Sequence, residues 1–303
     1  SGQTRGRDSA RNKLTPFSLL QACAIKTLIF SGGGNTCWWQ AGLISSLVNF
    51  GWKMPNTILG CSAGAAVAAA LVTNTTEKAL QSCKDLYASN PRMLLPHQGN
   101  DGAWNYFAQN KIYPNWLRSF FGADELQMLR SKCFRVTASK LNSAYGKKKA
   151  ILHAIVKHVF AKDQFGTGKN NKRSPSPTGL IEASLDLSAC KELSEALLFL
   201  EATAAAAPFI SGRKIKNDTY FDGGYISSIP ELTDQKQSEH PTSITLLTSY
   251  SKHRPLTFVD AGRLYIQPSK LIPVSTWGCT ATTRVDAAFN LGQQDAQQLT
   301  RKL

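Results

Sequence analysis

The sequence predicts an α/β fold in which a mainly parallel central sheet is flanked by helices. Two strand–loop–helix transitions support this: the apolar run 24–31 enters a glycine loop and a helix, and the run 57–61 enters a second tight turn and helix. The third observation is that strand-like and helical patterns continue to alternate as far as residue 299. Both loops follow parallel strands, so they are expected at the same edge of the sheet, where ligands bind in open α/β folds.

The remaining elements can be assigned in order from hydrophobic spacing and from residues that end helices. A helix over 38–50 ends at Gly51, which suits the residue after a helix C-terminus. Further patterns predict helix 77–88, strand 132–140, helix 192–205, strands 219–221, 243–248 and 264–267, and helix 283–299. The stretch 90–102 is rich in Pro, Gly and Asn and is expected to be irregular.

Composition divides the chain into a basic N-terminal arm, 1–20, and a single folded domain, 21–303. Inside the domain, 75–130 is an aromatic, helical region that reads either as core or as a lid at a membrane interface. Residues 146–178 form a basic insertion, expected to be flexible, that either faces an anionic membrane or is a solvated surface loop. The basic residues expected to contact such a membrane are Lys147, Lys148, Lys149, Lys172 and Arg173.

The formal charge of +15 favours an anionic partner: a phospholipid surface, nucleic acid or an acidic protein. Solubility alone is the alternative explanation, and no nucleic-acid-binding motif is present, so nucleic acid is not expected. No apolar run of about 18 residues or signal peptide is visible. The seven scattered cysteines indicate neither disulfides nor a zinc site and suit a reducing compartment. We therefore expect a cytoplasmic or peripheral membrane location, and the oligomeric state is left open.

The turn after the second strand has the pattern Gly-x-Ser-x-Gly, formed by Gly60, Ser62 and Gly64. A serine on a tight strand-to-helix turn has its hydroxyl exposed, and small residues on either side prevent clashes. The following helix also points its unpaired N–H groups at the same place. Ser62 is therefore a candidate nucleophile, although an ordinary Gly-Ser turn would have the same sequence.

The loop Gly32, Gly33 and Gly34 opens a helix directly after a strand, which suits backbone N–H groups that approach a small anion. A phosphate-binding P-loop requires a Lys that is absent here, and Cys37 occupies the third glycine position of a dinucleotide fingerprint. A transient oxyanion is therefore the favoured ligand of this loop.

A nucleophilic serine also needs a base. Asp222 follows a short strand and precedes Gly223 and Gly224, a placement that suits a carboxylate held in a pocket. A simple Asp-Gly-Gly hairpin turn is the other interpretation. In the chain order Ser, Asp, His, only His240 and His253 follow this acid, and both have the surroundings of exposed loop residues.

Together, Ser-Gly-Gly-Gly-Asn, the Gly-x-Ser-x-Gly turn and the late Asp-Gly-Gly resemble the three motifs of patatin-like phospholipases. The small-residue run 202–208 and Pro230 are also similar to that family, over roughly residues 25–230, and 273–277 looks like bacterial members. The resemblance implies that Ser62 is the nucleophile, Asp222 its sole base and Gly32–Gly34 the oxyanion hole. It implies no metal and no cofactor.

The substrates that the resemblance implies are fatty-acyl esters of membrane phospholipids, cleaved as by a phospholipase A. Thr36 and Cys37 after the glycine loop, and Ser228 and Ile229 near the Asp motif, depart from the family pattern and affect the expected substrate preference. Two alternatives remain: a catalytically silent membrane- or protein-binding module on the same fold, and a serine thioesterase or esterase.

Overall fold

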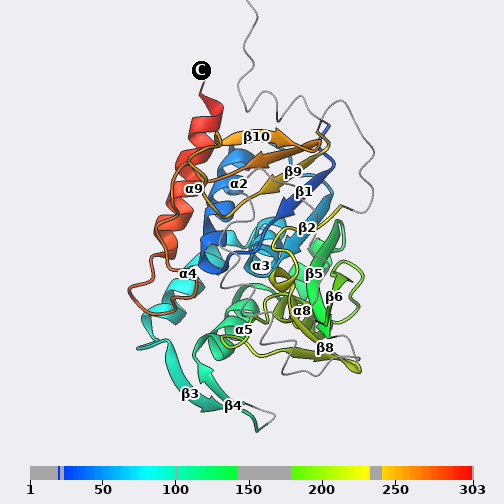
Figure 1. The fold of residues 1–303 in the computed structure, drawn as a ribbon, viewed down its shortest axis with the longest axis vertical. Helices are drawn as coiled ribbons and strands as arrows, with labels where there is room; N and C mark the ends of the chain where they lie inside the picture. Colours follow the sequence, from blue (N-terminus) through cyan, green and yellow to red (C-terminus); the bar gives the residue numbers. More distant parts are fainter. Residues whose placement is uncertain (1–19, 21–23, 100–101, 142–178, 233–240, 302–303) are drawn as a thin grey trace, which may run out of the picture.

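The structure is a computed structural model that describes residues 20, 24–99, 102–141, 179–232 and 241–301 (Figure 1). The helices are α2 Cys37–Asn49, α3 Ala63–Val72, α4 Thr76–Ala88, α5 Gln109–Phe120, α6 Ala123–Leu129, α8 Leu193–Thr203 and α9 Val285–Thr300, with the short 3₁₀ helices η1 Gly34–Thr36 and η2 Gly223–Tyr225. The strands are β1 Thr27–Phe30, β2 Thr57–Cys61, β3 Leu94–Gln98, β4 Trp104–Phe107, β5 Cys133–Leu141, β6 Leu180–Asp186, β7 Arg213–Ile215, β8 Asp218–Asp222, β9 Ser243–Leu246, β10 Thr257–Asp260 and β11 Arg263–Ile266.

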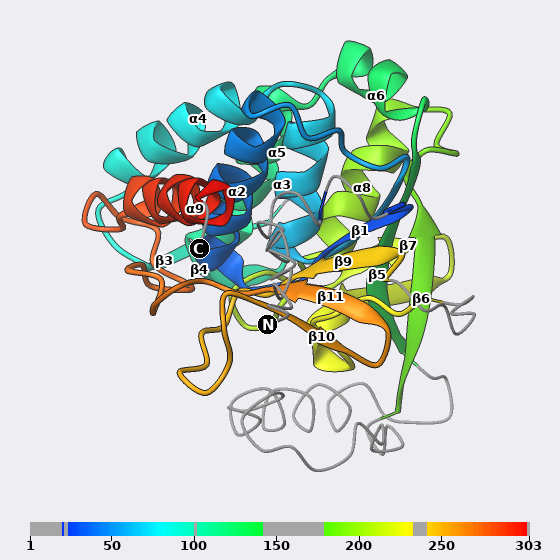
Figure 2. The ribbon, with the colours of Figure 1, turned by 90° about the horizontal axis from the view of Figure 1, so that it is seen from above.

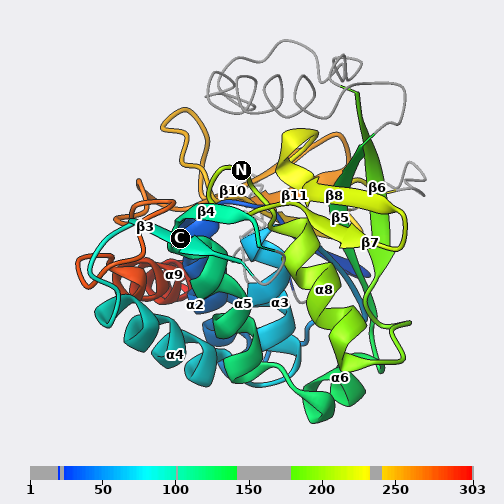
Figure 3. The ribbon, with the colours of Figure 1, turned by 90° about the horizontal axis from the view of Figure 1, so that it is seen from below.

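The central sheet has the strand order β10-β11-β9-β1-β2-β5-β8-β7, with β6 also paired to β5. Its five middle strands, from β11 to β5, are parallel, while β10, β6, β8 and β7 pair antiparallel. The predicted mainly parallel sheet is confirmed, and the antiparallel strands make it a mixed one. Figures 2 and 3 view the sheet from opposite ends, and in both the described α-helices lie on the same side of it.

Helix α2 lies at the centre of the helical layer because its apolar residues cover more than one face. Trp38, Trp39 and Ile44 point in three different directions around the helix, and each is at most 3% exposed within the main hydrophobic core. Phe30 of β1 belongs to the same core, so the helix and the strand on either side of the glycine loop are both firmly packed. This packing holds the predicted ligand-binding edge in place.

Two glycines let α2 and α9 approach each other closely. A Cβ atom on Gly42 would lie 1.9 Å from the carbonyl oxygen of Phe289, and one on Gly292 would lie 2.1 Å from that of Trp39. The indole N–H of Trp39 also donates to buried Asp295 of α9, at 2.7 Å. The C-terminal helix thus contacts the backbone of the helix that the glycine loop begins.

Strand β5 aligns the two halves of the candidate site. Along one edge it pairs first with β2, with Cys61 opposite Thr137, and then with β8, with Asp222 opposite Ala138. Strand β6 occupies the other edge. The residue that follows β2 and the last residue of β8 are therefore brought together beside consecutive β5 residues.

The hairpin β3–β4 was not predicted, because its sequence contains a residue that strands avoid. Pro96 lies inside β3, and the pairing register shifts between Leu94 and His97, which accommodates a residue that cannot donate to the ladder. Strands β6, β7 and β10 were also missed, and β7 and β10 are only 3 and 4 residues long. The expectation of irregular structure over 90–102 was therefore wrong for the β3 part.

Some expectations fall on residues outside the described part of the chain. These are the basic arm, except Leu20, and the whole of the basic insertion, including its lysines. Among the described residues, no helix is both long and apolar enough to cross a membrane. The six described cysteines carry free thiols, and all except Cys133 are buried.

Candidate active site

Ser62 lies on a strained turn between β2 and α3. Its φ of 54° and ψ of −136° are rare for a residue with a side chain. The flanking glycines are required by close contacts, because a Cβ on Gly60 would lie 2.6 Å from Ala65 Cα and one on Gly64 would lie 2.4 Å from the Ser31 carbonyl oxygen. The turn thus has the geometry of a nucleophile elbow.

Asp222 meets this serine at the end of β8. The Ser62 hydroxyl donates to Oδ2 of Asp222 at 2.6 Å, and both residues are 6% exposed. The other carboxylate oxygen, Oδ1, accepts the N–H of Gly224 at 2.7 Å. Gly223 also approaches β5 closely, since a Cβ there would lie 2.5 Å from the Thr137 carbonyl oxygen.

The alternatives for Asp222 are not favoured by this arrangement. The β7–β8 hairpin turns between Ile215 and Asp218, so Asp222 is not in its turn. His253 is exposed and does not line the pocket beside Ser62. His240 lies outside the described residues.

Residues at the end of α8 form hydrogen bonds with the backbone of both Ser62 and Asp222. These contacts were not predicted from the sequence. Thr203 Oγ1 accepts the N–H of Ser62 at 2.9 Å and donates to the Thr137 carbonyl at 2.5 Å. Two residues later, the Ala205 carbonyl accepts the N–H of Asp222 at 3.0 Å. The small-residue run 202–208 was noticed in the sequence, but nothing in it distinguishes Thr203 from its neighbours.

The glycine loop lies beside Ser62, and its three glycines differ in what their N–H groups do. The N–H of Gly32 donates to the Ser228 carbonyl at 2.8 Å, so it is not free to bind an oxyanion. The N–H groups of Gly33 and Gly34 donate to no described residue. Gly34 has φ +58°, and a Cβ there would lie 2.4 Å from the Thr276 carbonyl oxygen.

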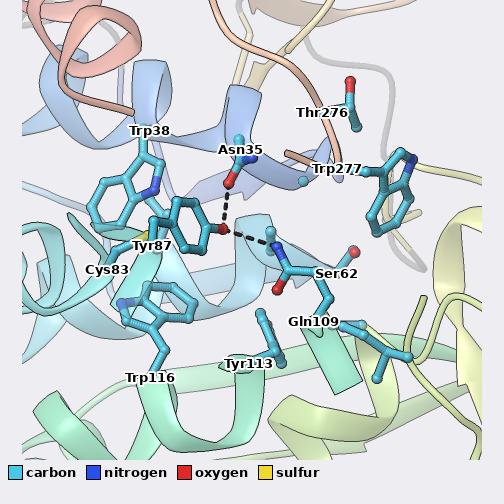
Figure 4. A pocket seen from close by; sticks show the side chains of 15 residues that line it. Asn35, Trp38, Ser62, Cys83, Tyr87, Gln109, Tyr113, Trp116, Thr276 and Trp277 are labelled. Carbon is cyan, nitrogen blue, oxygen red and sulfur yellow. Dashed lines mark hydrogen bonds between the residues drawn. The ribbon is translucent and has the colours of Figure 1, made fainter. Parts of the chain in front are cut away.

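A pocket with about 490 Å³ of empty space, part of it open to solvent, begins at Ser62 (Figure 4). Its apolar lining residues include Trp38, Val67, Trp116 and Ile210. Cys83 also lines it, and burial raises the pKa of its thiol to about 12, so it stays neutral. No described residue of the lining is charged, which suits an uncharged hydrocarbon group.

Other lining residues of the pocket carry side chains that form hydrogen bonds. Gln109 Nε2 donates to the Tyr87 hydroxyl at 3.0 Å, and that hydroxyl donates to Asn35 Oδ1 at 2.8 Å, as the dashed lines of Figure 4 mark. Among the described residues, no three His, Cys, Asp or Glu side chains form a group that could hold a metal ion.

Comparisons with known proteins give one family. The family model described as patatin-like phospholipase matches residues 28–233. A search of curated proteins finds no match. Among solved structures, the fold is similar to the crystal structure of VipD from Legionella pneumophila, with a TM-score of 0.46 and 12% sequence identity over 91% of this chain. The matched region spans 66% of the VipD chain.

Proposed function

The chain belongs to the patatin-like phospholipase family, and from this premise we propose that it is a phospholipase A-type lipid acyl hydrolase with a Ser62–Asp222 dyad. The observation that carries the proposal is the 2.6 Å hydrogen bond from the Ser62 hydroxyl to Asp222 at the start of a largely apolar pocket. The substrates proposed are fatty-acyl esters of membrane phospholipids.

In the proposed reaction, Asp222 Oδ2 takes the Ser62 proton while Oγ attacks the ester carbonyl carbon. The bond from Gly224 to Oδ1 keeps Oδ2 directed at the serine. The carbonyl oxygen becomes an oxyanion, which accepts the N–H groups of Gly33 and Gly34 and, at the start of α3, of Ala63. Asp222 then protonates the departing alcohol, and a water molecule releases the fatty acid from the acyl-enzyme.

The experiment that tests the proposal combines turnover with covalent labelling. We expect fatty-acid release from phospholipid vesicles, and labelling of Ser62 by a fluorophosphonate, located by peptide mass spectrometry. Labelling with turnover of acyl-thioesters alone would favour the thioesterase alternative. Neither labelling nor turnover, with or without anionic lipid, would favour the silent binding module.

Thr203 offers a test of how the dyad is positioned. Thr203→Val keeps the shape but leaves the Ser62 N–H without its acceptor, so we expect kcat to fall about 10- to 100-fold while KM changes little. Steady-state kinetics on a short-chain soluble ester measures this. Thr203→Ser retains the hydroxyl and should keep most of the wild-type rate. A Thr203→Ser protein that folds normally but is inactive would contradict the role assigned to this hydroxyl.

The exposed face of the β3–β4 hairpin supports a proposed membrane contact. Leu94, Trp104 and Tyr106 are 57%, 63% and 58% exposed, and the hairpin projects from the lower end of the molecule in Figure 1. Trp and Tyr suit the headgroup level of a bilayer. Residues 91–122 contain a single acid, Asp101, against three basic residues, Arg92, Lys111 and Arg118, and this excess of positive charge also suits an anionic surface.

The hairpin also connects to the pocket. Phe107 packs edge-on against Phe209 with ring centroids 4.7 Å apart, and Phe209 stacks on the pocket residue Trp277 at 4.5 Å. The predicted lid role of region 75–130 and the membrane role of the basic insertion remain part of this proposal.

We expect the double variant Trp104→Ser with Tyr106→Ser to lower binding to anionic vesicles about 10-fold or more, measured by sedimentation. Activity on a soluble ester should not change, because neither side chain reaches Ser62. The matched control is Val259→Ser with Leu271→Ser, which also removes two exposed apolar side chains, at 60% and 75% exposure. If both double variants bind vesicles equally well, the β3–β4 hairpin is not the membrane contact.

A further inference from the structure

Tyr113 is a feature of the pocket that the proposed hydrolysis leaves unexplained. It lies on α5, lines the pocket with Ser62 and is 7% exposed. Its hydroxyl is buried and forms no hydrogen bond with any described residue. A buried hydroxyl without a partner costs roughly 1–3 kcal/mol, so such a group calls for a specific reason.

The neighbouring polar group on the same face of α5 is Gln109, one turn earlier, and i,i+4 residues lie side by side on a helix. The direction of the hydrogen-bond chain is fixed at its far end, since Asn35 Nδ2 donates to the carbonyls of Ser275 and Gly278. Asn35 Oδ1 must therefore accept from Tyr87, which in turn accepts from Gln109 Nε2. The side-chain carbonyl of Gln109 accepts no hydrogen bond from a described residue.

Among the polar groups of the described lining are thus a donor, the Tyr113 hydroxyl, and an acceptor, the Gln109 carbonyl, one helical turn apart on α5. An alcohol hydroxyl accepts one hydrogen bond and donates another, so it satisfies both groups at once. We propose that Tyr113 and Gln109 bind a free, uncharged hydroxyl group of the substrate. This inference rests on the proposed function and narrows it to esters that carry a free hydroxyl.

Charge disfavours an ionised ligand at this position. Burial, and next the negative charge of Asp222, raise the pKa of Tyr113 well above its ordinary value, so its hydroxyl remains a neutral donor. The pocket lining contains no Lys, Arg or His that could neutralise a phosphate or carboxylate. The free hydroxyl has two possible sources: a hydroxylated acyl chain, or the unesterified glycerol carbon of a monoacyl phospholipid.

The test compares two pairs of substrates with wild-type protein and Tyr113→Phe. One pair is 12-hydroxystearoyl and stearoyl esters of the same alcohol; the other is monoacyl and diacyl phosphatidylcholine. We expect Tyr113→Phe to lower kcat/KM roughly tenfold for the hydroxyl-bearing member of one pair, and to leave its partner unchanged. The pair that responds identifies the source of the hydroxyl.

Two controls separate this role from a structural one. Tyr250→Phe removes a hydroxyl from a residue outside the pocket and should leave both pairs unchanged. Tyr113→Phe should melt at the same temperature as wild type or slightly higher, because it loses no hydrogen bond within the protein. A clear fall in melting temperature would instead indicate a structural role and overturn the proposal.

A binding measurement keeps the result independent of turnover. The same lipids are titrated into the Ser62→Ala protein, with and without Tyr113→Phe, by calorimetry. This inference alone is overturned if the wild-type protein hydrolyses the lipids but Tyr113→Phe changes neither the preference between the members of each substrate pair nor the binding of the lipids. Absence of hydrolysis counts against the proposed function, and the binding ratio then decides the role of Tyr113 by itself.

Discussion

Ser62→Ala and Asp222→Asn should each reduce fatty-acid release from phospholipid vesicles to background, a loss of at least about 10³-fold. The alanine variant removes the attacking oxygen. The asparagine variant keeps the size of the side chain and its contact with Gly224, but an amide cannot take the serine proton. Because the two residues act as a unit, the double variant should be no worse than either single one.

The matched controls are Ser131→Ala and Asp124→Asn, both on exposed parts of the fold. They should retain wild-type rates, and all variants should melt within a few degrees of wild type. Retention of most activity by Asp222→Asn would mean that the base lies elsewhere, and would make His240 or His253 the next residues to replace.

Gly292→Ala should lower the melting temperature by roughly 6–12 °C, which corresponds to about 3 kcal/mol for a domain of this size. In isolation, alanine favours a helix over glycine by about 1 kcal/mol, so helix propensity alone predicts the opposite sign. The clash wins here, because the new Cβ would lie 2.1 Å from the Trp39 carbonyl oxygen and 2.6 Å from the Leu43 amide nitrogen. Differential scanning calorimetry measures the change.

Gln294→Ala is the control for this prediction, since it lies on the same helix with its side chain exposed. It should leave the melting temperature unchanged or raise it slightly. An equal melting temperature for Gly292→Ala and wild type would mean that α9 can move away from α2 without loss, and that the close contact is not needed for stability.

The features that the sequence predicted are those encoded by neighbouring residues. The Gly60–Gly64 turn, the glycine loop after β1 and the helices α2, α4 and α8 depend on local spacing, and each lies within one or two residues of its expected place. The pairing of the loops at one sheet edge followed from parallel topology. The residues alone left open whether Asp222 is a base or part of a hairpin turn, and only the resemblance favoured the base, because its contact with Ser62 depends on β5.

The missed features depend on partners distant in the chain. Thr203 contacts Ser62 across 141 positions, and no local pattern distinguishes it from other helical threonines. From the sequence alone, Gly292 is a residue that lowers helix propensity, and only the packing of the α2 backbone against it shows why glycine is needed there. The basic insertion is the opposite case. Its composition strongly predicts contact with a membrane surface, but it lies outside the described residues, so this prediction stays untested.

The separation of Ser62 and Asp222 by 160 positions has a consequence for how the protein is made. At a synthesis rate of about 5–20 residues per second, the ribosome needs roughly 8–32 seconds after adding the serine to add the aspartate. Strand β9, which lies between β1 and β11, is made later still. During that interval the growing chain holds a serine without its proton acceptor. The proposed ability to cleave lipids can therefore begin only after Asp222 and β9 have been made, so a growing chain that ends before them should not attack the membranes of the producing cell.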